Sequence, residues 1–278
     1  MITIHNDKLV VNISEKGAEL QNIIYDNTEV LWQGNPDIWG KRSPLLFPIV
    51  GRLIDDKLKF NGKEYPLKKH GFGQKKEFKL IENTDNKAVL MLESDEETKA
   101  VYPFDFVLKV TYTVCDNKLT VNFSVLNPGE DNIYFSIGGH PAFNCKIGDY
   151  LLFEKNETLN KSLIDNNAYT YGSEPYLNNN NKIVLTDTIF DNDALVFKNT
   201  SSKSITLKTD SYDVKLTYND APYLGIWAKP KAPYVCIEPW YGVNDSIDAN
   251  CEFNNKEGIV PLKSKEEFNY TYDVEIIK

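Results

Sequence analysis

Strict alternation of apolar and polar residues is the feature that most constrains how this chain can fold. From Phe106 to Val114, every second residue is apolar, and lysine or threonine stands between. The alternation resumes from Leu119 to Val125, after the turn residues Asp116-Asn117-Lys118. Because successive side chains of a strand point to opposite faces, each run predicts a strand with one buried face. Together they predict a β-hairpin.

The same pattern recurs elsewhere, over residues 268–276 and more briefly over 214–217. Long segments with a 3.6-residue apolar period are missing, and Gly, Pro and Asn interrupt the chain throughout. We therefore predict an all-β fold, a large antiparallel β-sandwich. No linker divides the sequence, so we expect a single domain over residues 1–278. The polar stretch from Asp165 to Lys182 is interpreted as a long surface loop between strands.

Composition narrows the class of protein. The 278 residues are 41% hydrophobic and 26% charged, and the formal net charge is −9. That charge argues against nucleic acid or an anionic membrane as the main partner, since both attract lysine and arginine. The N-terminus has neither a signal peptide nor a transmembrane pattern, so we expect a cytoplasmic protein. Cys115, Cys145, Cys236 and Cys251 lie far apart, and we expect free thiols.

Two of the three histidines lie in segments rich in turn residues. His70 opens His-Gly-Phe-Gly, and His140 lies in Gly-Gly-His-Pro-Ala-Phe-Asn. Glycine and proline favour stiff loops at strand ends, where catalytic side chains are often mounted. A hydrogen-bonded turn histidine is an equally good interpretation of each. His5 is expected on the surface, and no histidine has the spacing of a zinc motif.

Residues 234–242 contain a carboxylate among apolar and aromatic residues. Glu238 lies between Ile237 and Pro239, and partial burial there would raise its pKa and favour a general-base role. Trp240 offers an aromatic surface on which a sugar ring could stack. A structural carboxylate bound by backbone donors is the alternative for Glu238. Arg52, at the end of an apolar run, is either a ligand for substrate hydroxyls or an ordinary surface charge.

Four segments, taken together and in order, resemble the aldose 1-epimerase (galactose mutarotase-like) family, especially its bacterial LacX-type branch. They are Phe47-Pro48-Ile49-Val50-Gly51-Arg52, His70-Gly71-Phe72-Gly73, Gly138-Gly139-His140-Pro141-Ala142-Phe143 and Ile237-Glu238-Pro239-Trp240. Their spread means that the resemblance covers essentially the whole chain. It implies a β-supersandwich with an open cleft on one sheet.

The resemblance also implies roles for individual residues. Glu238 matches the base that takes the anomeric hydroxyl proton, and His140 matches the acid that protonates the ring oxygen. His70 matches a second histidine that binds the sugar, and Arg52 matches an arginine that contacts its hydroxyls. For the family's sugar-binding aspartate we choose Asp193, with Asp191 as its rival. Mutarotation needs only two proton transfers, so we expect neither cofactor nor metal.

The substrate and the alternatives stay open at this stage. Relatives that act on hexose 6-phosphates often carry an arginine shortly after His-Gly-Phe, where this chain has Gln74. We therefore favour a free aldose such as galactose or glucose, with a hexose 6-phosphate as the variant. A non-catalytic sugar-binding protein is the runner-up. A glycoside-cleaving enzyme would need a second catalytic carboxylate, which no motif selects. The sequence leaves monomer and homodimer open.

Overall fold

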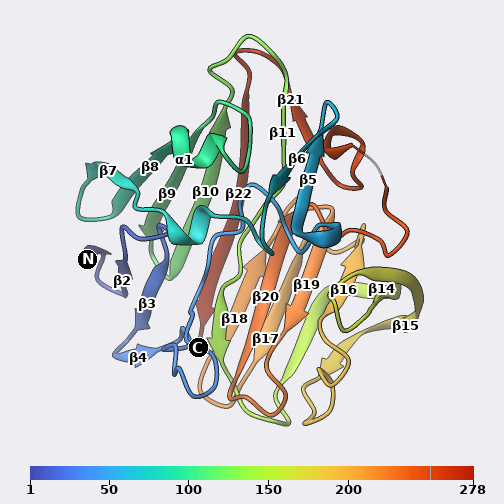
Figure 1. The fold of residues 1–278 in the computed structure, drawn as a ribbon. Coiled ribbons are helices and arrows are strands. Elements are labelled where there is room, and N and C mark those ends of the chain that lie inside the picture. The colour runs from blue at the N-terminus through green and yellow to red at the C-terminus, as the bar shows by residue number, and fades with distance from the viewer. Residues whose placement is uncertain (251) are drawn as a thin grey trace.

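The computed structural model describes residues 1–250 and 252–278, in which nearly all regular structure is β (Figure 1). One sheet of 14 strands dominates, with the order β12-β20-β19-β16-β14-β17-β18-β22-β10-β9-β8-β7; β13 also pairs with β20, and β15 with β14. Its strands are β7 (Lys79–Asn83), β8 (Lys87–Glu93), β9 (Val107–Cys115), β10 (Lys118–Leu126), β12 (Ile137–Gly138), β13 (Ala142–Asn144), β14 (Tyr150–Ile164), β15 (Thr170–Val184), β16 (Leu195–Lys198), β17 (Ser204–Lys208), β18 (Asp213–Thr217), β19 (Tyr223–Trp227), β20 (Tyr234–Tyr241) and β22 (Glu267–Ile277).

Three smaller sheets and four short helices complete the structure that is described. The four-stranded sheet contains β1 (Ile2–His5), β2 (Leu9–Ile13), β3 (Leu20–Tyr25) and β4 (Thr28–Glu29). The two-stranded sheets pair β5 (Lys57–Phe60) with β6 (Lys63–Pro66) and β11 (Ile133–Phe135) with β21 (Val260–Leu262). The helices are α1 (Glu96–Lys99) and the 3₁₀ turns η1 (Ile54–Asp56), η2 (Gly73–Lys75) and η3 (Phe253–Asn255). No helix within the described ranges has the length and apolar character needed to cross a bilayer.

The predicted all-β sandwich is confirmed. Strands β9 and β10 form the expected hairpin, in which Lys118 pairs with Cys115 and Leu126 with Val107. The turn residue Asp116 has a φ of 53°, a conformation that short polar side chains tolerate. The C-terminal run becomes β22, which joins the other edge of β10 and also pairs with β18.

The polar stretch from Asp165 to Lys182 is not the surface loop that we expected. Most of it belongs to β15, which pairs with β14 in a long hairpin with several register shifts. Most residues of β15 are exposed. Because neither face of the hairpin is fully buried, its sequence needs no alternation of apolar residues, and this explains the wrong prediction.

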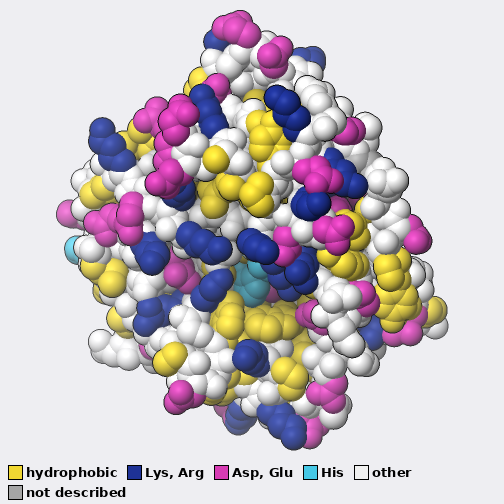
Figure 2. Space-filling view, in the orientation of Figure 1, with side chains coloured by type: hydrophobic (Ala, Val, Ile, Leu, Met, Phe, Trp, Pro, Cys, Tyr) yellow, Lys and Arg dark blue, Asp and Glu magenta, His cyan; other side chains and the backbone are white. Residues whose placement is uncertain are grey.

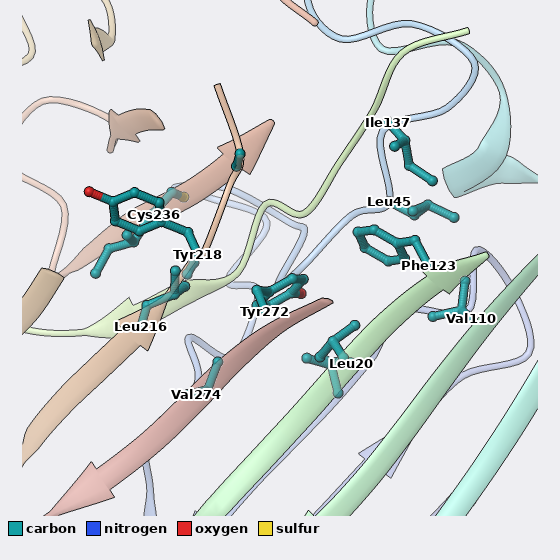
Figure 3. Packing of buried hydrophobic residues seen from close by; sticks show 14 of the residues in the cluster. Leu20, Leu45, Val110, Phe123, Ile137, Leu216, Tyr218, Cys236, Tyr272 and Val274 are labelled. Carbon is teal, nitrogen blue, oxygen red and sulfur yellow. The ribbon is translucent and has the colours of Figure 1, made fainter. Parts of the chain in front are cut away.

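The main core lies between the four-stranded sheet and the large sheet. Figure 3 shows Leu20 of β3 beside Phe123 of β10 and Tyr272 of β22, all of which belong to one buried cluster. The cluster continues along the large sheet to Leu216 and Cys236. The core thereby fixes the backbone of β20, the strand that carries Glu238.

The structure agrees with the expectation of free thiols for the described cysteines and with the expectation that His5 lies on the surface. Cys115, Cys145 and Cys236 are free thiols, and Cys251 lies outside the described residues. His5 is exposed on β1.

Candidate active site

Strand register brings His140 and Glu238 together. Strand β20 pairs antiparallel with β12 through Gly138 and Trp240, and with β13 through Ala142 and Cys236. His140 lies midway between the two β-segments, opposite Glu238. Because directly opposed residues of an antiparallel pair point to the same face, both side chains reach the same side of the sheet.

The two side chains are in contact and both are buried. His140 Nε2 lies 3.1 Å from Glu238 Oε2, and the residues are 8% and 1% exposed. The contact is close but lacks the angular geometry of a hydrogen bond, so neither Glu238 Oε2 nor His140 Nδ1 has a hydrogen-bond partner within residues 1–250 and 252–278. Buried polar atoms are rarely left without partners, and those that are often belong to functional sites. The structural alternative for Glu238 requires backbone donors, and none bonds to Oε2 among the described residues.

Burial shifts the pKa values of the pair in opposite directions. It raises the pKa of Glu238 well above its usual 4.5, while the positive charge of Lys69 opposes the shift. It lowers the pKa of His140 from 6.5 to about 3, and the charges of Lys41 and Lys69 add to that effect. A carboxylate of raised pKa is a stronger base, and an imidazolium of lowered pKa is a stronger acid.

His70 is held in an unusual backbone conformation beside this pair. Its φ is 64°, and its Nδ1 accepts a hydrogen bond of 3.1 Å from the Gly51 N–H. A neutral His70 therefore carries its proton on Nε2. Its ring centroid lies 6.0 Å from that of His140, with the ring planes perpendicular. Burial lowers the pKa of His70 well below 6.5.

Two glycines allow this arrangement. Gly51 has a φ of 72°, and a Cβ there would lie only 1.5 Å from Asn244 Oδ1. Gly71 has a φ of 67°, and its Cβ would lie 2.3 Å from the Phe47 carbonyl oxygen. Larger residues at these positions would displace the segments that carry His70 and Asn244.

His70, His140 and Glu238 line one cavity of about 220 Å³. Figure 2 shows a histidine at the hollow in the centre of this face, with apolar side chains beneath it and basic side chains around it. The residues that line the cavity are Trp39, Lys41, Pro44, Lys69, His70, His140, Ile164, Asp193, Ala194, Val196, Trp227, Glu238, Trp240 and Asn244. Trp39 stacks on His140 with ring centroids 5.2 Å apart, and Trp227 meets it edge-on at 5.9 Å. Such aromatic walls suit the C–H faces of a sugar ring.

Five of the six site residues expected from the sequence line this cavity, namely His70, His140, Asp193, Glu238 and Trp240. Asp191, the rival of Asp193, lines only a second and larger cavity beside the β14–β15 hairpin, whereas Asp193 lines both cavities. Trp240 is buried, and its Nε1 makes no well-aligned hydrogen bond among the described residues, although its indole lies close enough to Glu238 to oppose the rise that burial causes in the pKa of that carboxyl. The structure brings these residues together, and their individual roles stay predictions.

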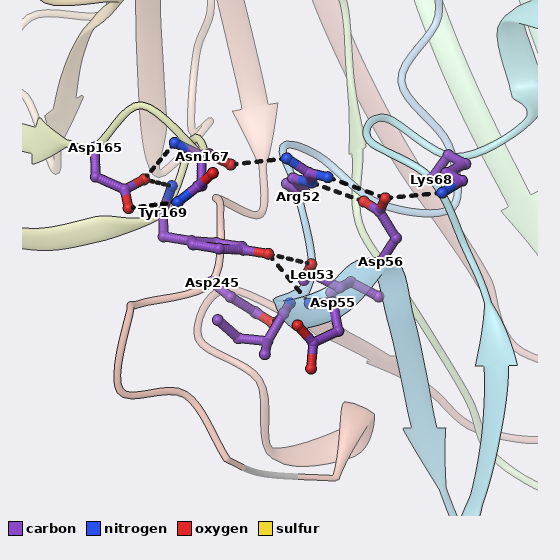
Figure 4. A network of polar contacts seen from close by, with 10 residues as sticks. Arg52, Leu53, Asp55, Asp56, Lys68, Asp165, Asn167, Tyr169 and Asp245 are labelled. Carbon is purple, nitrogen blue, oxygen red and sulfur yellow. Dashed lines mark hydrogen bonds and ion pairs between the residues drawn. The ribbon is translucent and has the colours of Figure 1, made fainter.

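Arg52 lies outside the cavity lining. Its guanidinium binds Asp56 at 2.8 and 3.1 Å and donates to the Asn167 carbonyl at 3.2 Å (Figure 4). Hydrogen bonds from Arg52 hold the pKa of Asp56 near 2, with help from Lys68. In this structure the arginine therefore joins the segment before η1 to the β14–β15 hairpin. This is a structural role that neither interpretation from the sequence included, and a contact with substrate hydroxyls stays a prediction.

The same network fixes the edge of the cavity. The Asp55 N–H donates to the Tyr169 hydroxyl, which donates to the Leu53 carbonyl (Figure 4). The Ile54 N–H donates to Asp245 Oδ2 at 2.9 Å, and Asp245 directly follows the lining residue Asn244.

Several lining residues were not selected from the sequence. Trp39 and Trp227 carried a weak signal, since the chain has only 4 tryptophans. Asn244 is one polar residue among many, and nothing around it marks it. Lys41 and Lys69 are two of many lysines in the sequence, and no pattern distinguishes them. Only the tertiary fold places them beside Glu238.

A metal could in principle use His140, Cys236 and Glu238, whose ligand atoms all lie within 4.8 Å of one another. Burial, however, raises the pKa of the Cys236 thiol well above 9.0 and also raises the pKa of Glu238. A metal needs both ligands deprotonated, so this environment opposes binding. We assign no metal role to the cluster.

The fold and the site together define a β-sandwich with a histidine–carboxylate pair at the base of an aromatic cavity. The chain belongs to the aldose 1-epimerase family, whose model matches residues 1–248. It is 29% identical to the plasmid-encoded protein LacX of Lactococcus lactis subsp. lactis over 296 aligned residues, which cover 99% of each chain.

Solved structures of mutarotase-like proteins are similar to this chain in both sequence and fold. A galactose mutarotase related enzyme from Lactobacillus acidophilus is 35% identical, with a TM-score of 0.94 over 99% of this chain and 97% of that one. A galactose mutarotase-like protein from Lactobacillus casei is 29% identical, with a TM-score of 0.94 over 99% of both chains.

Proposed function

We propose that this protein is a cofactor-independent mutarotase that interconverts the α and β anomers of a hexose. The observation that carries the proposal is the buried contact between His140 Nε2 and Glu238 Oε2, in a cavity with aromatic walls. Membership of the aldose 1-epimerase family supports the same class of reaction.

The proposed chemistry is one proton removed and one proton delivered. Burial favours the shared proton on Glu238 in the resting pair, and its transfer to His140 across the 3.1 Å contact gives the reactive form. In that form Glu238 takes the proton of the anomeric hydroxyl, His140 gives its proton to the ring oxygen, and the C1–ring-oxygen bond breaks. Rotation about C1–C2 exposes the other face of the aldehyde, and the reverse transfers close the ring. No electrons are exchanged, and the pair ends with the one proton that it held at the start.

The environment strengthens both partners for this exchange. The raised pKa of Glu238 makes its carboxylate a better base, and the lowered pKa of His140 makes its imidazolium a better acid. His70, whose Nδ1 is bound to Gly51, can donate from Nε2 to a sugar oxygen. Trp39 and Trp227, whose rings meet edge to face with centroids 5.5 Å apart, would form one aromatic wall against the C–H groups of the ring.

The test is optical rotation of freshly dissolved α-galactose and α-glucose with wild type, Glu238→Gln and His140→Asn. Wild type should accelerate the approach to equilibrium. In each variant the catalysed rate should fall by a factor of about 10²–10⁴. Near-wild-type turnover in Glu238→Gln would remove the proposed base. Saturable sugar binding by calorimetry without any acceleration would favour a sugar-binding protein instead.

A further inference from the structure

Two lysines lie in the same cavity as the histidine–carboxylate pair. Lys69 immediately precedes His70, and Lys41 follows Trp39 by two residues. Both line the cavity with His140 and Glu238. Figure 2 shows the outcome at the surface, where basic side chains surround the central histidine on a molecule of net charge −9.

Among the described residues, neither lysine is neutralised by a direct ion pair, although Glu19 lies near Lys41, and Asp193 and Glu238 line the same cavity. Lys41 Nζ contacts the neutral amide oxygen of Gln74. Of the neighbouring lysines, Lys68 pairs with Asp56 at 3.0 Å and Lys76 with Glu97 at 2.7 Å, while the exposed Lys75 lies outside the cavity lining. An acidic chain could readily have supplied partners, so unpaired ammonium groups lining a cavity point to an anion that is brought by the ligand.

The lysines are also close enough to the site to affect its titration. Both lysines keep exposed side chains at the mouth of the cavity. Partial desolvation by the cavity wall lowers the pKa of Lys41, Glu19 opposes the shift, and the charges of Lys75 and Lys69 lower it further. The charges of Lys41 and Lys69 likewise contribute to the lowered pKa values of His70 and His140, after burial. An anion bound between the lysines would relieve this repulsion.

We propose that the natural substrate is an aldose that carries an anionic group, and that Lys41 and Lys69 bind that group. This inference rests on the proposed mutarotase function. Glu238 and His140 would contact the anomeric hydroxyl and the ring oxygen of the sugar. The anionic group must therefore be a substituent at another carbon of the sugar. A phosphate ester and a uronic acid carboxylate share the required charge.

A second role for the lysines would be to tune the catalytic pair, and the two roles differ in substrate dependence. A tuning lysine affects charged and neutral sugars alike, because it acts through Glu238 or His140. A lysine that contacts the anion affects only the charged sugar. The ratio of kcat/KM for a charged sugar to kcat/KM for its neutral counterpart reports only the contact between lysine and the anionic group. Effects on Glu238 or His140 change both values equally and cancel in the ratio.

The experiment measures anomer exchange by NMR for glucose, glucose 6-phosphate, galactose, galactose 6-phosphate and glucuronate. The proteins are wild type, Lys41→Gln, Lys69→Gln and the control Lys75→Gln. Lys75 is an exposed lysine that lies near Lys41 but does not line the cavity. A long-range effect of net charge would therefore appear in the control as well.

We expect wild type to prefer a charged sugar, and each cavity variant to lower the charged-to-neutral ratio about ten- to hundredfold. Lys75→Gln should change the ratio by less than about twofold, because screening weakens an exposed charge that makes no contact. The phosphate and carboxylate substrates decide which anion is used.

Wild-type preference for the neutral sugars, or an unchanged ratio in both cavity variants, would overturn the inference and leave the mutarotase proposal intact. If no sugar is turned over, the mutarotase proposal fails separately. Calorimetry of glucose and glucose 6-phosphate binding to Glu238→Gln, with and without Lys69→Gln, then tests the lysines without catalysis. Equal affinity for the two sugars would overturn the lysine assignment.

Discussion

At the scale of single residues, the site combines buried ionisable groups with incomplete hydrogen bonding. Glu238 is 1% exposed, and its Oε2 has no hydrogen-bond partner among the described residues. A fold optimised for stability alone would avoid such a group, because an isolated buried charge is costly. Substrate hydroxyls can supply the missing partners, which couples sugar binding to relief of that cost.

Glu238→Gln should leave the protein as stable as wild type or more stable. Its folded-state pKa is raised, so wild type loses stability as pH rises through that pKa, whereas the amide has no charge to bury. The melting temperature of the variant should match or exceed that of wild type, with a difference that grows with pH. A large loss of melting temperature would instead indicate a structural carboxylate.

The pH dependence of kcat should reflect the buried histidine. Because burial holds the pKa of His140 near 3, the pair should keep its single proton as pH falls through 6.5. We expect kcat to be steady there and to decline only toward pH 3. A clear loss of kcat with a midpoint near 6.5 would show that His140 titrates as an exposed histidine does.

Asp193 and Asp191 can be compared directly as candidates for the sugar-binding aspartate. Asp193 lines the cavity and Asp191 does not. Asp193→Asn should lower kcat/KM about tenfold or more through loss of a charge-assisted hydrogen bond to a sugar hydroxyl. Asp191→Asn should change it less than about twofold. The opposite order would transfer the role to Asp191.

At the scale of elements, some of the strands and loops that build the site could be predicted from the sequence, and others could not. The β9–β10 hairpin and β22 could be predicted because each has one buried face and therefore alternates. The β14–β15 hairpin could not, because much of it faces solvent. Glu238 and His140 could be found because their motifs resemble those of a family. Trp227 and Lys41 could not, because only the packing of distant loops and strands brings them to the cavity.

The loop after β20 is held by a buried ion pair. Lys256 Nζ lies 2.9 Å from Asp245 Oδ1 and also donates to the Val243 carbonyl at 2.6 Å. Asp245→Asn removes the partner charge from a lysine that is 5% exposed. We expect a loss of about 3–5 kcal/mol in the free energy of unfolding, measured with urea.

Adding Lys256→Met to Asp245→Asn should recover part of that loss, because no unpaired charge then stays buried. A loss below about 1 kcal/mol in the single variant would show that water or rearrangement compensates Lys256.

At the scale of the whole molecule, one continuous sheet runs from β12 to β7 and joins the strands of the site to the far edge. Its core is contiguous with that of the N-terminal sheet, as Figure 3 shows. We therefore predict one cooperative unfolding transition, with coincident curves from far-ultraviolet circular dichroism and tryptophan fluorescence. Two separated transitions would contradict the single-domain organisation that the sequence suggested.

The most direct test of the proposed acid–base pair is anomer exchange at equilibrium, followed by NMR exchange spectroscopy on α/β mixtures of free and 6-phosphorylated glucose and galactose. No net change occurs in such a mixture, so added exchange can come only from catalysis. We predict exchange cross-peaks that grow with wild-type concentration for at least one of these sugars and disappear with Glu238→Gln. Equal cross-peaks with wild type, with Glu238→Gln and without protein would contradict the assignment of His140 and Glu238 as a mutarotase pair.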